Sequence, residues 1–251
     1  MTAAYDEIGR DYGEYRRADP RLAAAIWAAL GNARSVINVG AGSGSYEPAD
    51  RDVLAVEPSA VMIAQRPPGA ARALQATAES LPLYDDSFDA AMAVLTLQHW
   101  TDVEQGLAEL SRVARQRIVL VTMDVEQLGE HWLIRDYIPE TLATQAVAFP
   151  SISSLERALP GASVSVLAVP RDCTDRFMAA LWARPEDYFD PRLRNATSAW
   201  HELPDQIVER ALGTLRCDLD SGRWDERYGH LRRMPELDVG LRIVCAELGA
   251  G

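Results

Sequence analysis

The sequence contains no lysine, and all 25 of its basic residues are arginine. A Schiff base to a carbonyl substrate or to pyridoxal phosphate needs a lysine amine. A phosphate-binding loop of the G-x-x-x-x-G-K-[ST] type also needs a lysine. Both kinds of chemistry are therefore excluded.

Positive charge is scarce as well. The chain has 251 residues, of which 37 are acidic, and its formal net charge is −12 at pH 7. Proteins that bind nucleic acid neutralise many phosphates with clustered positive charge. We therefore expect no nucleic-acid partner.

Cysteines and long apolar runs are few. Cys173, Cys217 and Cys245 lie far apart, a spacing that fits neither a disulfide framework nor a metal site. No apolar run is long enough to span a bilayer. Residues 1–17 carry acids and tyrosines where a signal peptide would need an apolar core. We expect a cytoplasmic protein without a metal or a membrane partner.

Strand-like apolar runs alternate with helical patterns in the first half of the chain. This alternation is typical of an α/β fold in which helices cover a parallel sheet. The expected strands are 35–39, 52–56, 71–76, 88–97 and 117–123. The expected helices are 23–30, 60–65 and 103–114.

The pattern changes after Asp124, although no linker or repeat divides the chain, and we expect a single domain over 1–251. Residues 125–150 are irregular and rich in Trp, Tyr, His and Ile, which suits a cap. Strand patterns return at 163–169 and 239–248. Between them, 170–238 read as mostly helical. This insertion is far longer than an ordinary connection of about 4–6 residues.

A glycine-rich loop follows the first expected strand. Gly40-Ala41-Gly42-Ser43-Gly44 comes directly after Val36–Val39. Glycines allow the backbone to turn sharply and to lie against a ligand. The dinucleotide fingerprint G-x-G-x-x-G would need its third glycine at Ser45, so the spacing fits a nucleoside without a pyrophosphate better than NAD. A plain strand–helix turn is the alternative.

An acidic residue, Glu57, ends the second expected strand. A carboxylate at this point can accept hydrogen bonds from the ribose hydroxyls of a nucleoside bound over the first loop. The alternative is a solvated glutamate at a strand end.

In these motifs the sequence resembles the class I S-adenosylmethionine-dependent methyltransferases, in particular their small-molecule, methyltransferase type 11-like branch. The likeness covers about residues 1–124. The motifs that carry it are Gly40–Gly44, Val56–Ser59 with Met62, Ala76–Leu83 with Asp86–Asp89, Leu97–Trp100, Leu107–Arg112, and the N-terminal Tyr5, Tyr12 and Arg16.

The resemblance implies a fold and an activity. The fold is a Rossmann-like, seven-stranded, mostly parallel sheet with helices on both faces, a cap over 125–150 and a helical insertion over 170–238 before the last strand. Residues 1–124 would bind S-adenosyl-L-methionine, and the insertion would shape the acceptor pocket. The activity would be in-line transfer of the methyl group to a small organic acceptor.

Site residues also follow from the resemblance, position by position. Polarizable Met62 would pack on the adenine face. The methionyl part would lie against Gly40, Ala41, Gly42 and Gly44, with Tyr12 and Arg16 folded over it; Glu57 and Pro58 would hold the ribose; Thr77, Ala78 and Glu79 would border the adenine edge; Ala93 and Val94 would face the methyl group.

Two positions depart from the family pattern. Asn38 stands where the family usually has an acid that orders the glycine loop. Thr77 stands where an aspartate often bonds the adenine amine. Both residues keep hydrogen-bonding capacity but remove a charge, so we expect a functional site with lower affinity.

His99 is the candidate general base, because it directly follows the strand segment that would border the methyl group. A base is needed only where the acceptor must lose a proton. The alternative is a histidine that holds the loop by hydrogen bonds. His131, in the expected cap, is a second candidate.

Two other functions stay open at this point. A nicotinamide-dependent oxidoreductase is disfavoured by the G-x-G-x-G spacing and by the lack of a Tyr-x-x-x-Lys arrangement. A non-catalytic nucleoside-binding domain is conceivable because of Asn38 and Thr77. The sequence does not decide between O, N, C and S acceptors, or between a monomer and a homodimer.

Overall fold

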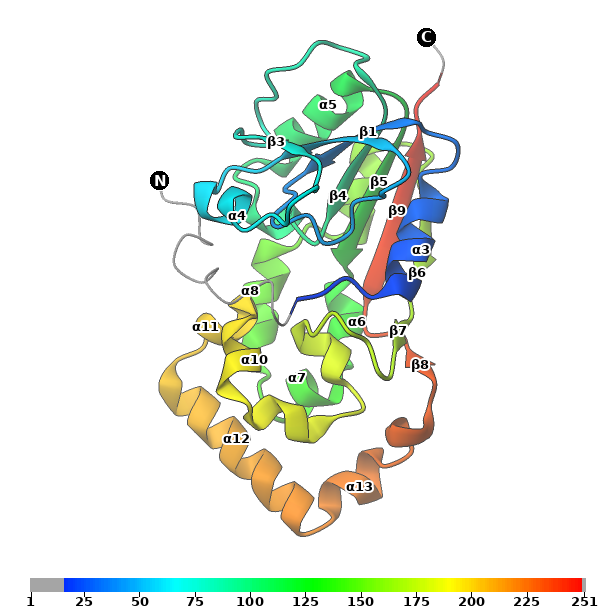
Figure 1. Ribbon diagram of the computed structural model, residues 1–251. Coiled ribbons are helices and arrows are strands. Elements are labelled where there is room, and N and C mark those ends of the chain that lie inside the picture. Colours follow the sequence, from blue (N-terminus) through cyan, green and yellow to red (C-terminus); the bar gives the residue numbers. More distant parts are fainter. Residues whose placement is uncertain (1–15, 250–251) are drawn as a thin grey trace.

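A seven-stranded sheet forms the upper part of the molecule in Figure 1. The computed structural model describes residues 16–249, so the expected site residue Tyr12 lies outside the described residues. The strands, in spatial order, are β3 (Arg72–Leu74), β2 (Asp52–Val56), β1 (Ser35–Val39), β4 (Phe88–Val94), β5 (Ala114–Met123), β9 (Leu241–Glu247) and β6 (Ser163–Val166).

Most strand pairs of this sheet are parallel. β3, β2, β1, β4 and β5 run in one direction. The last strand, β9, enters between β5 and β6 and is antiparallel to both. The structure confirms the expected mostly parallel, seven-stranded α/β sheet. The bounds of β1 and β2 are those expected from the sequence, and the outer strands are shorter.

Both faces of the sheet are buried, because successive residues of β5 point to opposite sides. Ile118 and Leu120 belong to a core cluster with α5 (Val103–Val113) and α9 (Ile152–Ala158). Val119 and Val121 belong to a second cluster with α3 (Pro20–Ala29). Strands of a parallel sheet that are covered on both faces read as continuous apolar runs, as the sequence RIVLVTM does.

Local sequence sets the starts of these helices. Asp19 precedes Pro20 and accepts a hydrogen bond from the Arg21 amide, which is a favourable N-terminus for α3. Asp102 caps α5 through the Gln105 amide. Ser59 caps the short α4 (Ala60–Ala64) through the Met62 amide.

The segment 125–150 is helical, which corrects the expectation of irregular structure. It forms α6 (Val125–Gly129), α7 (Trp132–Asp136) and α8 (Glu140–Ala148). The side chains of Asp124 and His131 cap the first two. A five-residue helix has fewer than two turns, so its apolar periodicity cannot show in the sequence.

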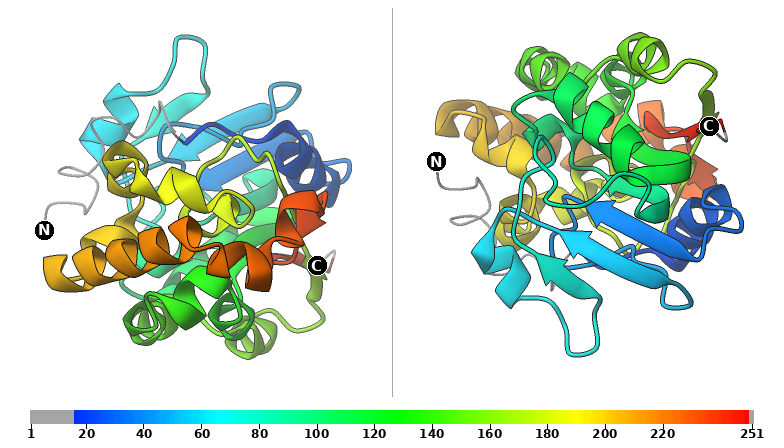
Figure 2. Two further views of the ribbon diagram at one scale, coloured as in Figure 1. Left: turned by 90° about the horizontal axis from the view of Figure 1, so that it is seen from below. Right: turned by 90° about the horizontal axis from the view of Figure 1, so that it is seen from above.

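Residues 170–238 are mostly helical, as expected. A two-stranded ladder of β7 (Val169–Pro170) and β8 (Glu236–Leu237) brings the two ends of this insertion together, which the sequence did not predict. Between them lie η3 (Met178–Leu181), η4 (Pro185–Phe189), α10 (Pro191–Asn195), α11 (Ser198–His201), α12 (Asp205–Asp220), α13 (Arg223–Tyr228) and η5 (Leu231–Arg233). In the view from below, α12 and α13 lie in front of the sheet (Figure 2).

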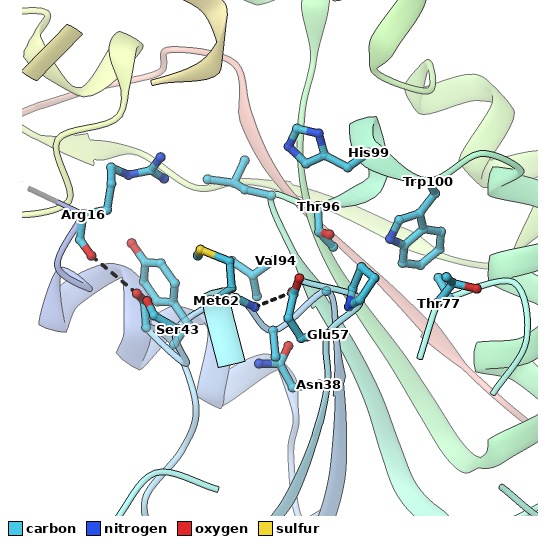
Figure 3. Close-up of a pocket in the computed structure, with 18 of the residues that line it drawn as sticks. Arg16, Asn38, Ser43, Glu57, Met62, Thr77, Val94, Thr96, His99 and Trp100 are labelled. Atoms are coloured by element: carbon cyan, nitrogen blue, oxygen red, sulfur yellow. Dashed lines mark hydrogen bonds between the residues drawn. The ribbon is translucent and has the colours of Figure 1, made fainter. Parts of the chain in front are cut away.

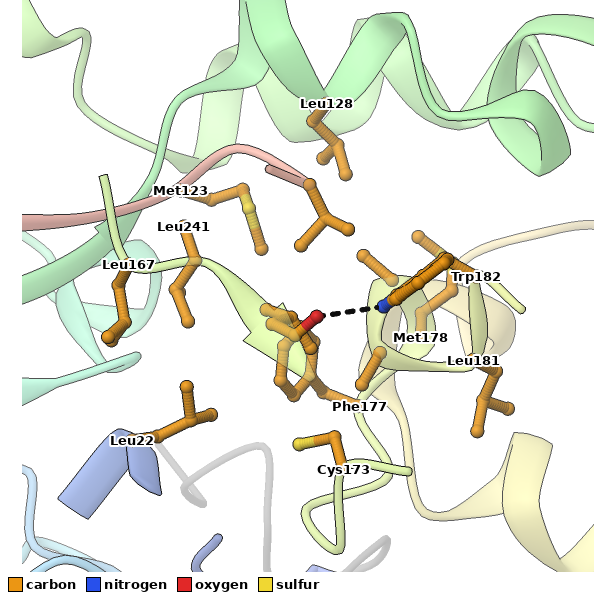
Figure 4. Close-up of a cluster of buried hydrophobic side chains, with 14 of the residues drawn as sticks. Leu22, Met123, Leu128, Leu167, Cys173, Phe177, Met178, Leu181, Trp182 and Leu241 are labelled. Carbon is orange, nitrogen blue, oxygen red and sulfur yellow. Dashed lines mark hydrogen bonds between the residues drawn. The ribbon is translucent and has the colours of Figure 1, made fainter. Parts of the chain in front are cut away.

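The second half packs on the sheet through one continuous apolar cluster (Figure 4). Trp182 is fully buried, and its indole N–H donates to the Val169 carbonyl at 3.1 Å. The Trp132 indole in turn donates to the Trp182 carbonyl at 2.7 Å. The helices therefore share their core with Leu22 and Leu241 of the sheet layer instead of forming a separate one. Within residues 16–249, no helix is both long and apolar enough to cross a membrane.

Asp89 joins three strands at the amino-terminal edge of the sheet. Its Oδ2 accepts the Arg34 and Ser35 amides at 2.8 and 3.0 Å, and its Oδ1 accepts from Arg115 at 2.6 Å. The Arg115 hydrogen bond first, and then the backbone amides, hold the pKa of Asp89 well below its ordinary value of 3.8.

We expect Asp89→Ala to lower the free energy of unfolding by about 2 kcal/mol at pH 7, since it leaves two backbone amides and two side-chain donors without their charged acceptor. The loss should stay constant down to about pH 4. Below that pH it should shrink, because the unfolded state then takes up protons that the folded carboxylate resists. Urea unfolding at pH 7, 4 and 2.5 measures this. Asp85→Ala, at an exposed ion pair with Arg112, is the control and should change stability by less than about 0.5 kcal/mol. A difference as large at pH 2.5 as at pH 7 would contradict the assignment.

Candidate functional site

A cavity of about 720 Å³ opens where β1, β2 and β4 end. The strand order reverses at β1, which has β2 on one side and β4 on the other. Open α/β sheets bind ligands at this kind of crevice. Twelve of the residues expected from the sequence line it: Arg16, Gly40, Ala41, Gly42, Glu57, Pro58, Met62, Thr77, Ala78, Glu79, Val94 and His99.

Two expected residues do not line the cavity. Ala93 is fully buried in the core cluster that contains α5. Side chains alternate along a strand, so Val94 faces the cavity and Ala93 cannot. Gly44 lies on the far side of its loop, where a Cβ atom would approach Glu47 and Arg66 within 3.0–3.2 Å.

The glycine loop is held tightly against β4. The Gly40 amide donates to the Val56 carbonyl at 2.8 Å, and its φ of +71° is a conformation that favours glycine. A Cβ atom at Gly40 would lie 2.0 Å from Oγ1 of Thr96, which is two positions beyond the end of β4. Glycine is therefore required here by both conformation and space.

Glu57 connects the second strand to this loop. Its Oε2 accepts the Gly42 amide at 2.8 Å, and its Oε1 accepts the Ser59 amide at 2.9 Å. The side chain is buried at 7 % exposure and still lines the cavity. These bonds fix the carboxylate at the wall of the cavity.

A buried ion pair supports the loop from beneath and explains how Asn38 is tolerated. Asn38 Nδ2 donates to Glu47 at 3.2 Å, and Glu47 pairs with Arg66 at 2.6 Å. Arg66 also donates to the Gly42 carbonyl at 3.2 Å. The acid that the family pattern has at position 38 is thus present nearby, as Glu47. Asn38 Oδ1 has no hydrogen-bond partner among the described residues.

One end of the cavity suits a flat, weakly polar group. Met62 is buried, with 2 % of its surface exposed. The Trp100 ring packs directly on Gly106, where any side chain would collide with it. Burial raises the pKa of Glu79, but hydrogen bonds outweigh it and lower that pKa. Prominent among them are those from the Thr101 hydroxyl and amide at 2.9 and 2.7 Å. Thr77 is exposed at this end (Figure 3).

The chain turns abruptly after β4. Leu95 has a φ of +51°, which is rare for a residue with a side chain. Its amide donates to Val121 of β5 at 2.8 Å, and its carbonyl accepts from the Gln98 side chain at 2.9 Å. Strained backbone of this kind is concentrated at functional sites. Here it directs Thr96 and His99 into the cavity.

His99 ends the one-turn helix η2 (Leu97–His99) and is exposed along the cavity wall. The protein atoms around the cavity desolvate the ring and lower the pKa of His99 to about 4. The imidazole is therefore neutral at pH 7 and able to accept a proton. The second sequence candidate, His131, is buried outside this cavity, where its Nδ1 accepts the Leu133 amide at 3.2 Å.

The opposite end of the cavity is polar and combines three distant segments. Asp175 accepts from Arg16 Nε at 2.5 Å and from the Tyr46 hydroxyl at 2.7 Å. Asp175 is 1 % exposed and belongs to the insertion. Asp172 in the same segment is exposed and pairs with Arg21.

Nine cavity residues were not among the expected site residues. For eight of them, a position at or soon after the end of an expected strand could have indicated a place in the site, whereas nothing in the sequence near Asp175 does so. They are Asn38, Ser43, Ser45, Tyr46, Leu95, Thr96, Trp100, Thr101 and Asp175. Over residues 16–249, no group of three or more His, Cys, Asp or Glu side chains is placed to hold a metal ion.

We expect Gly40→Ala to weaken S-adenosylhomocysteine binding at least tenfold, because the new Cβ must displace Thr96 or the loop. Calorimetry measures the affinity, and thermal unfolding reports the fold. Gly69→Ala is the matched control: Gly69 has a φ of +85°, but a Cβ there would have no atom within 4 Å. Equal losses of affinity in the two variants would show that strain alone, and not the approach to Thr96, is responsible.

Comparison with known proteins places this geometry in a family. A model described as a methyltransferase domain matches residues 37–122. A crystal structure from Anabaena variabilis, assigned as a methyltransferase of an antibiotic biosynthesis pathway, is 30 % identical with a TM-score of 0.86. The match covers 94 % of this chain and all of that one.

Curated relatives match over a shorter length. The malonyl-[acyl-carrier protein] O-methyltransferase of Pseudescherichia vulneris is 32 % identical over 123 residues, which are 46 % of this chain and 49 % of that protein. An uncharacterised methyltransferase of Mycobacterium bovis is 36 % identical over 142 residues, 49 % of this chain and 57 % of that one. The chain thus spans about half the length of the curated relatives it matches. From the nearly complete match to the Anabaena structure, the family domain and the geometry of the cavity, we conclude that the chain belongs to the class I S-adenosylmethionine-dependent methyltransferases.

Proposed function

We propose that the protein transfers a methyl group from S-adenosylmethionine to a small organic acceptor. The observation that carries the proposal is the convergence of the glycine loop, Glu57 and the Met62–Trp100 end on one cavity at the reversal of strand order. A nucleoside with a short, charged tail matches this arrangement, because the cavity is apolar at one end and charged at the other.

In this proposal each wall has a role. The glycine loop contacts the methionyl part, and Glu57 holds the ribose. Met62 packs on the adenine, with Thr77, Ala78 and Glu79 at its edge. Val94 and His99 then lie beside the methyl group, at the end of the cavity that Arg16 also borders (Figure 3).

Methyl transfer from a sulfonium is an in-line displacement, so holding donor and acceptor in contact supplies much of the rate. We propose that the cap, 125–150, and the insertion, 170–238, form the acceptor side. Asp175 supports this, because it brings the insertion to the cavity. His99, neutral at pH 7, would take the acceptor's proton.

A small acceptor fits the cavity of about 720 Å³ and the net charge of −12, which disfavours a nucleic acid. The Anabaena relative is described as a methyltransferase from an antibiotic biosynthesis pathway, which agrees with a small acceptor. The name of the curated Pseudescherichia relative offers a second acceptor class, an acyl group on a carrier protein. Cysteine scarcity and the absence of a spanning helix within 16–249 lead us to infer a cytoplasmic enzyme.

We expect S-adenosylmethionine and S-adenosylhomocysteine to bind and NAD not to bind. Glu57→Ala should weaken S-adenosylhomocysteine binding by roughly 1–3 kcal/mol, because ribose hydroxyls lose a buried partner. Titration calorimetry measures both. Glu104→Ala, an exposed position in α5, is the control and should bind like the wild type.

Binding of NAD alone would overturn the proposal in favour of an oxidoreductase. Binding of S-adenosylmethionine without methyl transfer to any compound of a metabolite extract would favour a non-catalytic nucleoside-binding domain. Unchanged affinity in Glu57→Ala would show that the ribose lies elsewhere.

We expect His99→Ala to slow turnover about 100-fold or more as the loss of a general base, with little change in KM. In the wild type, kcat/KM should fall as the pH drops through about 4, to which burial lowers the pKa of His99 in the ligand-free protein, since the protonated ring cannot accept a proton. His201→Ala, at an exposed position, should leave kcat unchanged. A less than tenfold effect of His99→Ala would leave this residue only a positioning role.

A further inference from the structure

Asp175 occupies an unusual place for a charged side chain. It is 1 % exposed and lies in a segment far outside the matched family domain, yet it lines the cofactor cavity. Both of its oxygens accept strong donors, Arg16 Nε at 2.5 Å and the Tyr46 hydroxyl at 2.7 Å. Burial of an ionised carboxylate is costly unless it is paired and hydrogen-bonded, and here it is both.

The contacts of Asp175 fix the direction of Arg16. Because the carboxylate accepts from Nε, the guanidinium is held along one edge, and only 11 % of the side chain is exposed. The Arg16 carbonyl also accepts a hydrogen bond from the Ser45 hydroxyl at 3.4 Å. The guanidinium carbon of Arg16 lies 6.0 Å from the centre of the Phe177 ring. A long, flexible side chain is thereby confined to one orientation at the cavity wall.

The same carboxylate also restrains the loop that follows the glycines. Burial, and then the Asp175 charge, raise the pKa of Tyr46, so its hydroxyl remains a donor. Tyr46 is itself held by its carbonyl, which accepts the Trp27 indole N–H at 2.9 Å. Asp175 therefore fixes the positions of the glycine loop and Arg16 relative to each other.

A second row of contacts holds this segment in place. Thr174 donates its amide to Asp19 at 3.0 Å, and Asp172 pairs with Arg21 at 2.8 Å. Residues 16–21 and 172–175 thus lie side by side, and of these residues Arg16 and Asp175 line the cavity. In Figure 3, Arg16 and Trp100 lie on opposite sides of the cavity, and Met62, which lies against the glycine loop at Gly42, is between them.

We propose that Asp175 is a positioning residue that aims Arg16 at the amino-acid end of the cofactor. A methionyl group carries a carboxylate, whose charge is complementary to that of the Arg16 guanidinium. Arg16 accommodates the carboxylate, since a guanidinium binds carboxylates through paired donors. This inference rests on the proposed function. It adds that the second half of the chain, through Asp175, determines how the methionyl end is held.

Two ligands separate this role from a general effect on the fold. S-adenosylhomocysteine has the amino-acid end, and 5′-methylthioadenosine has the same nucleoside without it. We expect Asp175→Asn to weaken S-adenosylhomocysteine binding about tenfold, the scale of one charge-assisted hydrogen bond, and to change 5′-methylthioadenosine binding less than twofold. Asp225→Asn, exposed in α13 and also paired with an arginine, Arg232, is the matched control and should leave both affinities unchanged.

A double-mutant cycle tests whether Asp175 acts through Arg16. Arg16→Gln should produce the same selective loss, and Arg16→Gln with Asp175→Asn should bind no more weakly than Arg16→Gln alone. Additive losses would overturn the positioning role. Tyr46→Phe keeps the contact between Asp175 and Arg16, and its affinity for S-adenosylhomocysteine should fall less than threefold. This variant controls for disturbance of the loop that contains Tyr46.

The outcomes are distinct from those that test the proposed function. If the wild type binds neither ligand, the proposed function fails and this inference with it. If the wild type binds both and Asp175→Asn loses both equally, or loses neither, the function stands and the positioning role is overturned. Thermal unfolding of each variant shows whether the fold is intact.

Discussion

Because both faces of the parallel sheet are buried, polar chemistry is restricted to the ends of its strands. Ile118 and Val119 are adjacent in β5, and both are fully buried on opposite sides. Carboxylates and backbone donors can therefore remain solvated only beyond the strand tips. The reversal of order at β1 separates two such tips and leaves a crevice between them. The cavity, the support beneath the glycine loop and the position of the second half all follow from this constraint.

The parts of the site next to strand ends could be predicted from the sequence. Gly40 and Glu57 directly follow short apolar runs, so locating the strands also located these residues. The direction of a side chain was harder to predict. Ala93 and Val94 were both expected at the cavity, and the bounds of β4 decide that only one can face it.

Residues that reach the site from elsewhere in the chain carry no local signal. Asp175 meets Arg16 across 159 positions and Tyr46 across 129, distances at which a sequence pattern gives no register. Glu47 lies only nine positions from Asn38, but nothing in its surroundings marks it as the substitute acid. The short helices α6 and α7 were missed for a different reason, since a single turn or two has no measurable periodicity.

The exclusive use of arginine affects how loops are held. Arg112 bonds Glu109, Asp85 and the carbonyls of Leu81 and Leu83, which secures the connection between β3 and β4. Arg210 joins α12 to α8 through Glu140 and the Tyr137 carbonyl. A guanidinium has five N–H donors in a fixed plane, whereas an ammonium group has three N–H donors on one nitrogen at the end of a flexible chain. Each of these arginines can therefore bridge several acceptors at once.

The position of β9 has a consequence for how the chain folds. β9 pairs with β5 on one side and β6 on the other, so the sheet stays divided until residues Leu241–Glu247 are available. During synthesis, β5 has an unpaired edge until the helices and short strands between Met123 and Leu241 have emerged. An open edge of this kind invites pairing with other chains. Completion of the sheet is thus a late event, and non-local pairings of this length form slowly. The newly made protein is most exposed to aggregation just before its last strand is released.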